Sequence, residues 1–120
     1  NIMKDKNKVK RNNFFRRQRR TRAKITGTSA RPRVSVFRSL MHISIQAIDD
    51  VAKKTFLTAT DQTIKAKGTK TEIAALVGEA FGKKLKGKKI ESIIFDKGAY
   101  KYHGRVKALA DGIRKAGIKF

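Results

Sequence analysis

After residue 33, apolar and polar side chains alternate with a period of two in three consecutive short segments. The clearest alternation covers residues 42–48, and the segments 34–38 and 54–60 lie on either side of it. A period of two places successive side chains on opposite faces of a β-strand. Short polar connections join the segments, and one begins with Asp49-Asp50, which is typical of a turn. The pattern therefore predicts three strands in an antiparallel meander.

A helical period follows in the second half of the chain. Residues 61–68 are predicted to be a polar loop, and Thr69 and Glu72 have the spacing of a capping box. An apolar stripe then recurs every three to four residues, through Ile73, Leu76, Val77, Ala80, Phe81 and Leu85. Gly87 is predicted to stop this helix. A second helix is predicted from about Gly104 to Ala116, with a stripe of Val106, Leu109, Ala110 and Ile113.

A short apolar run, Ile93-Ile94-Phe95, separates the two helices and is typical of a strand buried on both sides. The third strand, first helix and fourth strand then form a crossover, which should be right-handed. We therefore predict an α/β fold: a mixed four-stranded sheet of order 3-2-1-4, an antiparallel meander plus one parallel strand, with two packed helices. Two helices cannot cover both faces, so the face carrying Ser44 and Gln46 is expected to stay partly open.

Residues 1–33 lack this periodicity and are predicted to form a basic N-terminal arm and hinge, whereas residues 34–120 form the globular domain. The arm carries 13 Lys or Arg and a single acid, Asp5. It has few aliphatic residues, so on its own we expect it to be largely unstructured. Residues 26–33 are interpreted as the hinge, because Gly27 loosens the backbone and Pro32 prevents a helix from continuing.

The charge balance indicates a polyanionic partner. The 120 residues include 31 Lys or Arg and 9 Asp or Glu, a formal net charge of +22. The densest run, residues 16–22, has no acid to pair with, and a phosphate backbone is its natural counterion. A membrane surface fits less well, because the arm has no amphipathic stripe and no apolar run is long enough to span a bilayer. A solvated tail that aids solubility is the alternative interpretation of the arm.

Two groups of residues are candidates for RNA binding. In the arm, the predicted phosphate ligands are Arg16, Arg17, Arg19, Arg20, Arg22, Lys24, Arg31 and Arg33. Phe14 and Phe15 offer rings for base stacking. The loop before the second helix contributes Lys97, Tyr100, Lys101, Tyr102, His103, Arg105 and Lys107. The alternative interpretation of this loop is a helix cap whose tyrosines fold onto the domain.

Three further features have less specific signals. Arg38, beside the first hairpin turn, is either a phosphate contact or an exposed strand-end charge. His42 is either a base contact or a partly exposed sheet residue. The lysines between residues 83 and 89 fit phosphate binding, but a solvated helix end is the preferred interpretation.

The sequence does not support catalysis. Two-metal phosphoryl chemistry needs several converging carboxylates, and the strand 34–38 offers none. Asp49 and Asp50 are explained by a turn, and Asp96 is interpreted as a cap for its own loop or a partner of a nearby lysine. The chain has no cysteine, so His42 and His103 make no zinc set. We predict no catalytic residue, no metal and no cofactor.

Residues 31–39 with His42-Ile43 resemble the first hairpin of the bacterial large-subunit ribosomal protein L-eighteen family, and residues 96–111 resemble its C-terminal signature. The resemblance implies a ribonuclease H-like arrangement without its catalytic acids. It also implies a structural protein that binds 5S rRNA and helps attach it to the large-subunit (23S-type) rRNA in the central protuberance, beside neighbouring ribosomal proteins.

The same resemblance places the protein in the cytoplasm, in the large ribosomal subunit, with no membrane contact and no homo-oligomer. The rival hypothesis is a non-specific basic protein that compacts nucleic acid. This chain departs from the family pattern at Lys97, which replaces a usual Arg, and at Ala99, which replaces a usual Gly. Ala99 therefore should not require a positive φ.

Overall fold

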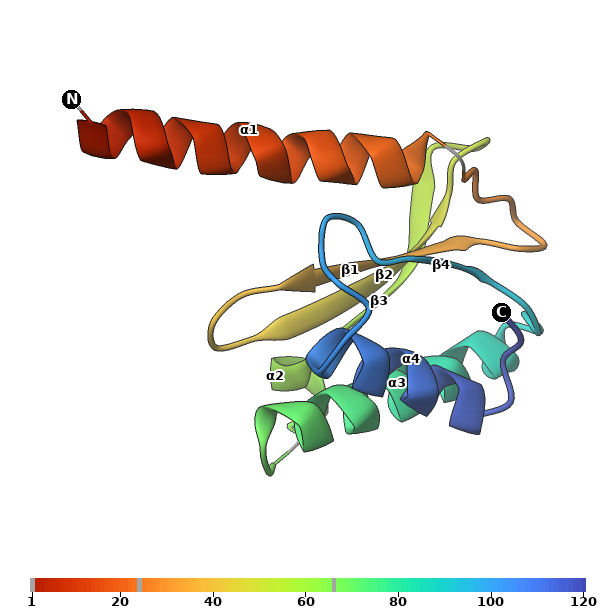
Figure 1. Cartoon of the computed structure of the whole chain (residues 1–120). Helices are drawn as coiled ribbons and strands as arrows, with labels where there is room; N and C mark the ends of the chain where they lie inside the picture. The colour runs from red at the N-terminus through yellow and green to blue at the C-terminus, as the bar shows by residue number, and fades with distance from the viewer. Residues whose placement is uncertain (1, 24, 66) are drawn as a thin grey trace.

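The computed structural model of this chain describes residues 2–23, 25–65 and 67–120, with side chains described from residue 7. The elements in chain order are α1 (Ile2–Arg22), β1 (Arg33–Arg38), β2 (Ile43–Asp49), β3 (Lys54–Thr60), α2 (Asp61–Ile64), α3 (Lys70–Gly87), β4 (Ile94–Asp96) and α4 (Arg105–Lys115) (Figure 1). The strands form a single mixed sheet of order β3-β2-β1-β4. β1 is antiparallel to β2 and parallel to β4, so the predicted α/β topology is confirmed.

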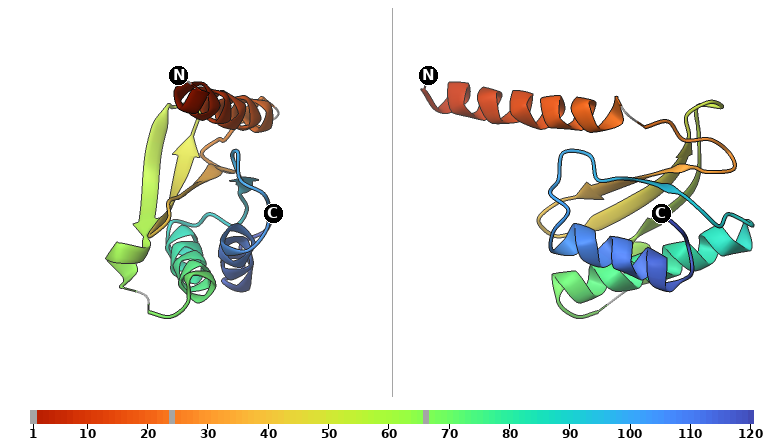
Figure 2. Two further views of the ribbon diagram at one scale, coloured as in Figure 1. Left: turned by 60° about the vertical axis from the view of Figure 1, so that its left-hand side comes forward. Right: turned by 45° about the vertical axis from the view of Figure 1, so that its right-hand side comes forward.

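The sheet is covered on one face and partly open on the other, because α3 and α4 lie side by side on the same side of it (Figure 2). Alternation along β1 and β2 turns the apolar residues toward these helices, and Val36 lies opposite Ile45 in the register. The core includes Val34, Val36, Ile43, Ile45, Ala47, Val77, Phe81, Leu85, Leu109 and Ile113. On the other face Gln46 is exposed and Ser44 is half-buried, as expected.

Hydrogen bonds and backbone angles at the helix ends confirm the helices predicted from the sequence. Thr69 Oγ1 accepts from the N–H of Glu72, and the Glu72 carboxylate accepts from the N–H of Thr69, which completes the capping box. Gly104 caps α4 with a φ of 58°, and Gly117 follows its C-terminal end with a φ of 99°. Both angles lie in the region that glycine adopts without a steric penalty.

Two predictions about local structure were wrong. Residues 61–64 form the short helix α2, because Thr60 Oγ1 accepts from the N–H of Thr63 and so caps one helical turn. The fourth strand is not buried on both sides, since Ile94 and Phe95 are only half-buried. β4 lies at an edge of the sheet. There the Phe95 ring is partly covered by the Phe120 ring, which stacks on it with ring centroids 5.5 Å apart.

The expectation of an unstructured arm was also wrong, because residues 2–22 form the helix α1. No glycine or proline interrupts residues 1–26, and Arg, Lys and Gln are good helix formers. The helix lies on the side of the sheet away from α3 and α4 (Figures 1 and 2). It contacts the domain at two places. Thr21 Oγ1 donates a hydrogen bond to the Gly98 carbonyl at 2.9 Å. The Phe14 ring packs edge-on against the Tyr100 ring, with ring centroids 5.8 Å apart.

The segment between α1 and β1 is held to the domain at two points. The Gly27 N–H donates to Asp50 Oδ2 at 2.7 Å, and its carbonyl accepts from the Asp50 N–H at 3.0 Å. A Cβ at position 27 would collide with the backbone nitrogen of Arg33. Glycine is therefore required here for close approach rather than for looseness. Pro32 is buried, and its carbonyl accepts from Ile94 N–H at 2.9 Å.

Four charged residues form a cluster beneath this segment, which we call the Arg33 cluster: Arg22, Arg33, Asp50 and Asp96. Arg33 is only 8% exposed and donates two hydrogen bonds of 2.9 Å to Asp50 and one of 2.8 Å to Asp96. Arg22 Nε lies 3.6 Å from the same Asp96 carboxylate. Hydrogen bonding from Arg33 holds the pKa of Asp50 below its ordinary value, although partial burial opposes this.

Gly78→Ala and Gly87→Ala, both in α3, should change the free energy of unfolding in opposite directions. A Cβ at position 78 would collide with the Leu109 carbonyl oxygen of α4, whereas a Cβ at position 87 meets nothing within 4 Å. We expect Gly78→Ala to lower the free energy of unfolding by about 1–3 kcal/mol through forced separation of the helices. Gly87→Ala should raise it by up to about 1 kcal/mol through helix propensity. Urea unfolding followed by circular dichroism measures both, and equal effects would contradict the close helix contact.

Asp50→Asn should destabilise the fold at neutral pH by about 2 kcal/mol, because Arg33 loses a charge-assisted partner. The pKa of Asp50 is lowered in the folded state, so its stabilising contribution is present above the unfolded-state pKa of about 3.9 and is lost as the pH falls through the folded-state value. The difference between wild type and variant should therefore shrink below about pH 4. Urea titrations at several pH values test this, and a difference that persists unchanged at pH 2 would argue against the ion pair.

Candidate nucleic-acid interface

A groove lies between α1, the end of β1 and the loop after β4, and we call it the arm–loop groove. It has a volume of about 480 Å³ and is lined by Phe14, Arg17, Arg38, Lys97, Ala99, Tyr100 and Lys101. These residues come from three segments that are far apart in the sequence. The fold thus brings together five of the predicted RNA ligands, namely Arg17, Arg38, Lys97, Tyr100 and Lys101.

Tyr100 holds the groove together. Its hydroxyl accepts from the Arg38 N–H at 3.1 Å and donates to the Arg38 carbonyl at 3.2 Å, which ties the loop to the end of β1. The Arg38 guanidinium lies 5.0 Å from the centre of the Tyr100 ring, a distance typical of a cation–π contact. Together with Phe14, these contacts fix the loop, the strand end and α1 in one arrangement.

The backbone of the loop is shaped by Asp96 and Gly98. The Asp96 carboxylate is fully buried and accepts from the Gly98 N–H at 2.8 Å, while Gly98 has a φ of 62°. Asp96 therefore caps its own loop, as one of the two sequence interpretations proposed, but its ionic partners are arginines rather than a lysine. Ala99 is not among the residues with positive φ, which agrees with the expectation for it.

The electrostatics of the groove favour an anion. Four of its lining residues are cationic and none is acidic. Arg17, Arg38 and Lys101 are exposed, and Lys97 is half-buried with its Nζ 3.4 Å from the Tyr100 carbonyl. Arginine binds phosphate oxygens in pairs, and the aromatic rings beside it offer surfaces for an unstacked base.

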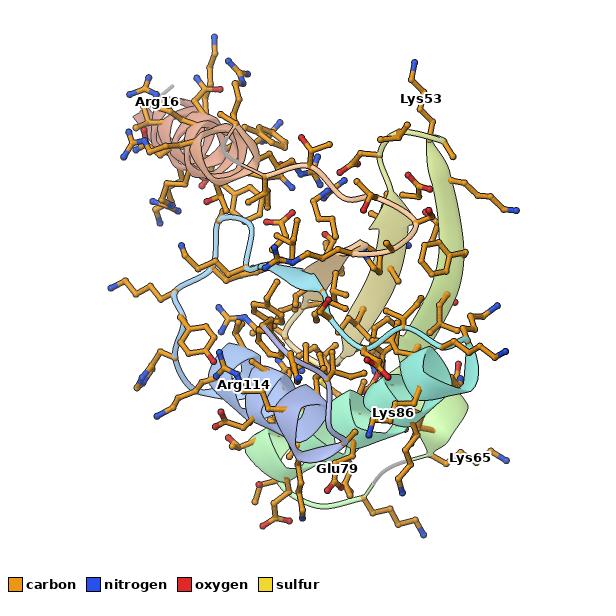
Figure 3. The ribbon with its side chains drawn as sticks, turned by 90° about the vertical axis from the view of Figure 1, so that its right-hand side faces the viewer. Arg16, Lys53, Lys65, Glu79, Lys86 and Arg114 are labelled. Carbon is orange, nitrogen blue, oxygen red and sulfur yellow. The ribbon has the colours of Figure 1, made fainter. Side chains whose placement is uncertain are left out.

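The other cations of α1 continue this positive surface. Arg16, Arg19 and Arg20 are exposed, and the side chains of the helix point outward all around its axis (Figure 3). Arg22 is half-exposed but lies beside Asp96, so the tertiary structure supplies one acid that the local sequence lacks. Arg31 is exposed with Nε 3.5 Å from the Ile93 carbonyl. Lys24 lies outside the described residues.

Arg33 is a correction to the predicted interface. It is buried within the Arg33 cluster, with both carboxylate partners at hydrogen-bonding distance, so its guanidinium is not available to a phosphate. The sequence alone does not show that Arg33 is buried and Arg31 exposed, because the two arginines flank the same proline.

Residues 102–107 lie next to the groove but do not line it. Tyr102 packs edge-on against Phe95, and its hydroxyl accepts from Arg114 at 2.9 Å. Arg105 donates to the Ser39 carbonyl at 2.8 Å, which ties α4 to the β1–β2 turn. His103 and Lys107 are exposed. Both tyrosines therefore fold onto the domain, and Tyr100 does so while lining the groove.

His42 is exposed at the start of β2 and is held by α2. Its Nδ1 lies 3.0 Å from Asp61 Oδ2, and its Nε2 lies 3.1 Å from the Gln62 amide nitrogen. Sequence reasoning missed the apolar surface beside it, where Phe37, Leu40 and Met41 are 63%, 83% and 72% exposed. The phase of the β1 alternation could have placed Phe37 on the open face.

The carboxylates of the described residues are not arranged as a metal site. Among residues 2–23, 25–65 and 67–120, no three His, Asp or Glu side chains gather closely enough to hold a metal ion. Asp49 serves the turn after β2, where its Oδ1 accepts from the N–H groups of Val51 and Ala52. None of the helices in this part of the chain is long and apolar enough to cross a membrane.

Comparison with known proteins gives a consistent result. The family model described as "Ribosomal L18 of archaea, bacteria, mitoch. and chloroplast" matches residues 7–120. The chain is 50% identical over 116 residues to the large ribosomal subunit protein uL18 of Leuconostoc mesenteroides, covering 97% of this chain and 96% of that one. It is 52% identical over 109 residues to the protein of the same name from Alkaliphilus metalliredigens, covering 87% and 89%.

The uL18 protein of Chloroherpeton thalassium is 47% identical over 114 residues, with 89% of this chain and 95% of that protein covered. The matches extend over both the arm and the domain. The chain therefore belongs to the ribosomal L18 family, a family of structural, non-enzymatic proteins of the large ribosomal subunit.

Proposed function

We propose that this protein binds 5S rRNA and helps attach it to the large-subunit rRNA in the central protuberance, beside neighbouring ribosomal proteins. The observation that carries the proposal is the arm–loop groove, in which cations and aromatic rings from three segments are already held beside a long basic helix. Family membership supplies the ribosomal context.

The helix α1 supplies most of the affinity in this proposal. Its 21 residues extend about 30 Å at the ordinary rise of an α-helix, which is long enough to follow several phosphates of an RNA groove. Cations on all sides of the helix can meet phosphates of both strands, and release of condensed counterions drives the binding. These contacts position the protein and carry no sequence information.

The arm–loop groove supplies selectivity. Phosphate recognition by Arg17, Arg38 and Lys101 is combined there with the rings of Phe14 and Tyr100, a pairing that suits a bent or unstacked RNA segment. The hydrogen bonds between Tyr100 and Arg38 preform this arrangement, so little ordering entropy remains to be lost on binding. A protein that only compacts nucleic acid has no need of such a groove.

Binding to 5S rRNA should weaken steeply with salt and should exceed binding to transfer RNA. Neutralising six or more phosphates gives a slope of about −5 or steeper in a plot of log affinity against log salt. Filter binding at several salt concentrations, with unlabelled transfer RNA as the competitor, measures both properties. A nearly flat slope would contradict the electrostatic mechanism, and equal competition by transfer RNA would favour the non-specific alternative.

The double variant Arg17→Gln/Lys101→Gln should bind 5S rRNA about tenfold more weakly and reduce the salt slope by about 2, because two phosphate contacts are lost. Both side chains are exposed, so the fold should be retained. The matched control is Lys70→Gln/Lys84→Gln, which removes two exposed cations from α3 on the other side of the sheet. If the control lowers affinity as much as the groove variant, the groove has no special role.

A further inference from the structure

The apolar stripe of α3 is wider than the sheet covers. Leu76 belongs to the stripe that the sequence predicts, but it is 42% exposed, whereas Val77 and Phe81 are fully buried. It is the only exposed large apolar residue of α3 and α4, two helices that the structure describes throughout. Leu76 therefore adds little to the core and leaves an apolar side chain on the outer surface of the helix pair.

A groove runs beside Leu76 between the two helices, and we call it the α3–α4 groove. Its volume is about 540 Å³. Its lining residues are Glu72, Ala75, Leu76, Glu79, Ala108, Asp111, Gly112 and Lys115. The helices approach closely here, since a Cβ at position 112 would collide with the Ala75 carbonyl oxygen. Small residues thus make the floor of the groove, and Leu76 stands at its side.

The groove has an acidic rim. The chain has only nine Asp or Glu, and three of them line this groove: Glu72 and Glu79 from α3, and Asp111 from α4. Glu72 and Asp111 are exposed, and Glu79 is half-buried. Lys115 is the single cation of the lining. A chain with a net charge of +22 therefore carries a locally negative groove.

Contacts within the domain account for these acids only in part. Glu72 completes the capping box, and Glu79 Oε1 pairs with Lys115 Nζ at 3.0 Å. Asp111 lies 3.8 Å from Arg114, and both side chains are about half exposed. Exposed ion pairs of this kind contribute about 0–1 kcal/mol. An ionised carboxylate offers several acceptor positions, so each of the three can accept further hydrogen bonds from a partner.

The spacing of the rim fits a helical partner. Glu72 and Glu79 are seven residues apart in α3, which is about 10 Å along the helix axis. The same distance separates residues i and i+7 of a second helix, and these lie on one face of it. A helix laid in the groove can rest a small apolar face on Leu76, Ala75 and Ala108. Its flanking cations then lie beside the carboxylates of the rim.

The groove faces away from the proposed RNA interface. α1 lies on the other side of the sheet, and Figure 3 shows Glu79 on the side of the molecule away from Arg16. The acidic rim repels phosphate, so the groove does not suit RNA. Exposed charges more than about 8 Å apart are largely screened at physiological salt, so the cations of α1 do not keep a basic segment from the rim.

We propose that the α3–α4 groove binds an amphipathic basic helix of another protein. Leu76 is the apolar anchor, and the rim carboxylates receive the Lys or Arg side chains of the partner, as in other helix-in-groove complexes. A second copy of this chain fits poorly, because two molecules of net charge +22 repel each other and α1 has no apolar stripe. The proposal assigns a protein partner to a face that RNA bound along α1 leaves free.

The test uses a fluorescent helical peptide of about 15 residues, or four turns, with leucine on one face and lysine on both flanks. A second peptide carries glutamate in place of each lysine. Full-length protein is titrated into each peptide at physiological salt, and binding is followed by anisotropy. Neither RNA nor another protein is present.

Three variants separate the possible causes of binding. Glu79→Gln/Asp111→Asn removes two acids of the rim, and Leu76→Ala removes the anchor. The matched control is Glu91→Lys at an exposed position outside the groove. It replaces a negative charge by a positive one, so it changes the net charge by the same two units as the double variant. Circular dichroism checks that each variant is folded.

The wild type should bind the lysine peptide at least about tenfold more tightly than the glutamate peptide, because only the first complements the rim. The double variant should bind the lysine peptide at least about tenfold more weakly than the wild type. Leu76→Ala should weaken binding about fivefold through lost apolar contact. Glu91→Lys should stay within about twofold of the wild type, since its charge is distant from the groove.

The proposal would be overturned if the wild type bound neither peptide, if it bound both equally, or if Glu91→Lys lost as much affinity as the double variant. Sedimentation equilibrium of the wild type alone should show a monomer. A dimer that Leu76→Ala dissociates would mean that a second copy occupies the groove, which would also refute the proposal. These measurements contain no RNA, so their failure leaves the proposed binding of 5S rRNA unaffected.

Discussion

The buried guanidinium of Arg33 is the interaction on which the rest of the arrangement depends. It holds Asp50, directly after β2, and Asp96, at the end of β4, by hydrogen bonds of 2.8 to 2.9 Å. Asp50 in turn fixes Gly27, and Asp96 fixes Gly98. A buried arginine without these carboxylates would be strongly unfavourable, so the two acids must lie where they do. The start of the domain and the groove loop are thereby positioned by one side chain.

This cluster also explains how so basic a chain folds. Several of the acids in the described residues stabilise the structure: Asp50 and Asp96 around Arg33, Asp49 in a turn, and Asp61 beside His42. Most of the other Lys and Arg side chains that the structure describes are exposed. The charge that opposes compaction is therefore the same charge that binds RNA, and an RNA partner relieves the repulsion that the folded chain cannot relieve by itself.

The arm shows how tertiary contacts add to local preference. A basic helix of this kind gains little from packing, since most of its side chains between residues 7 and 22 are exposed. Near its C-terminal end, Thr21 and Arg22 nevertheless contact the loop after β4 and Asp96. Two turns earlier, the Phe14 ring packs against Tyr100. These contacts give α1 a fixed direction relative to the groove. α1 and the groove are therefore held in one fixed arrangement rather than as a domain with a loose tail.

The sequence by itself determined the strands of the meander, the helices α3 and α4, the strand order and the basic character of the chain. These depend on side-chain periodicity and on caps such as Thr69 with Glu72, which act over a few residues. The tertiary structure alone decided that Arg33 is internal while Arg31 is exposed, that Tyr100 closes onto Arg38, and that α1 docks on the loop after β4. The physical reason is that burial and charge pairing depend on which segments, distant in the sequence, come within a few ångströms of each other. The pattern of side chains within one segment does not determine those contacts.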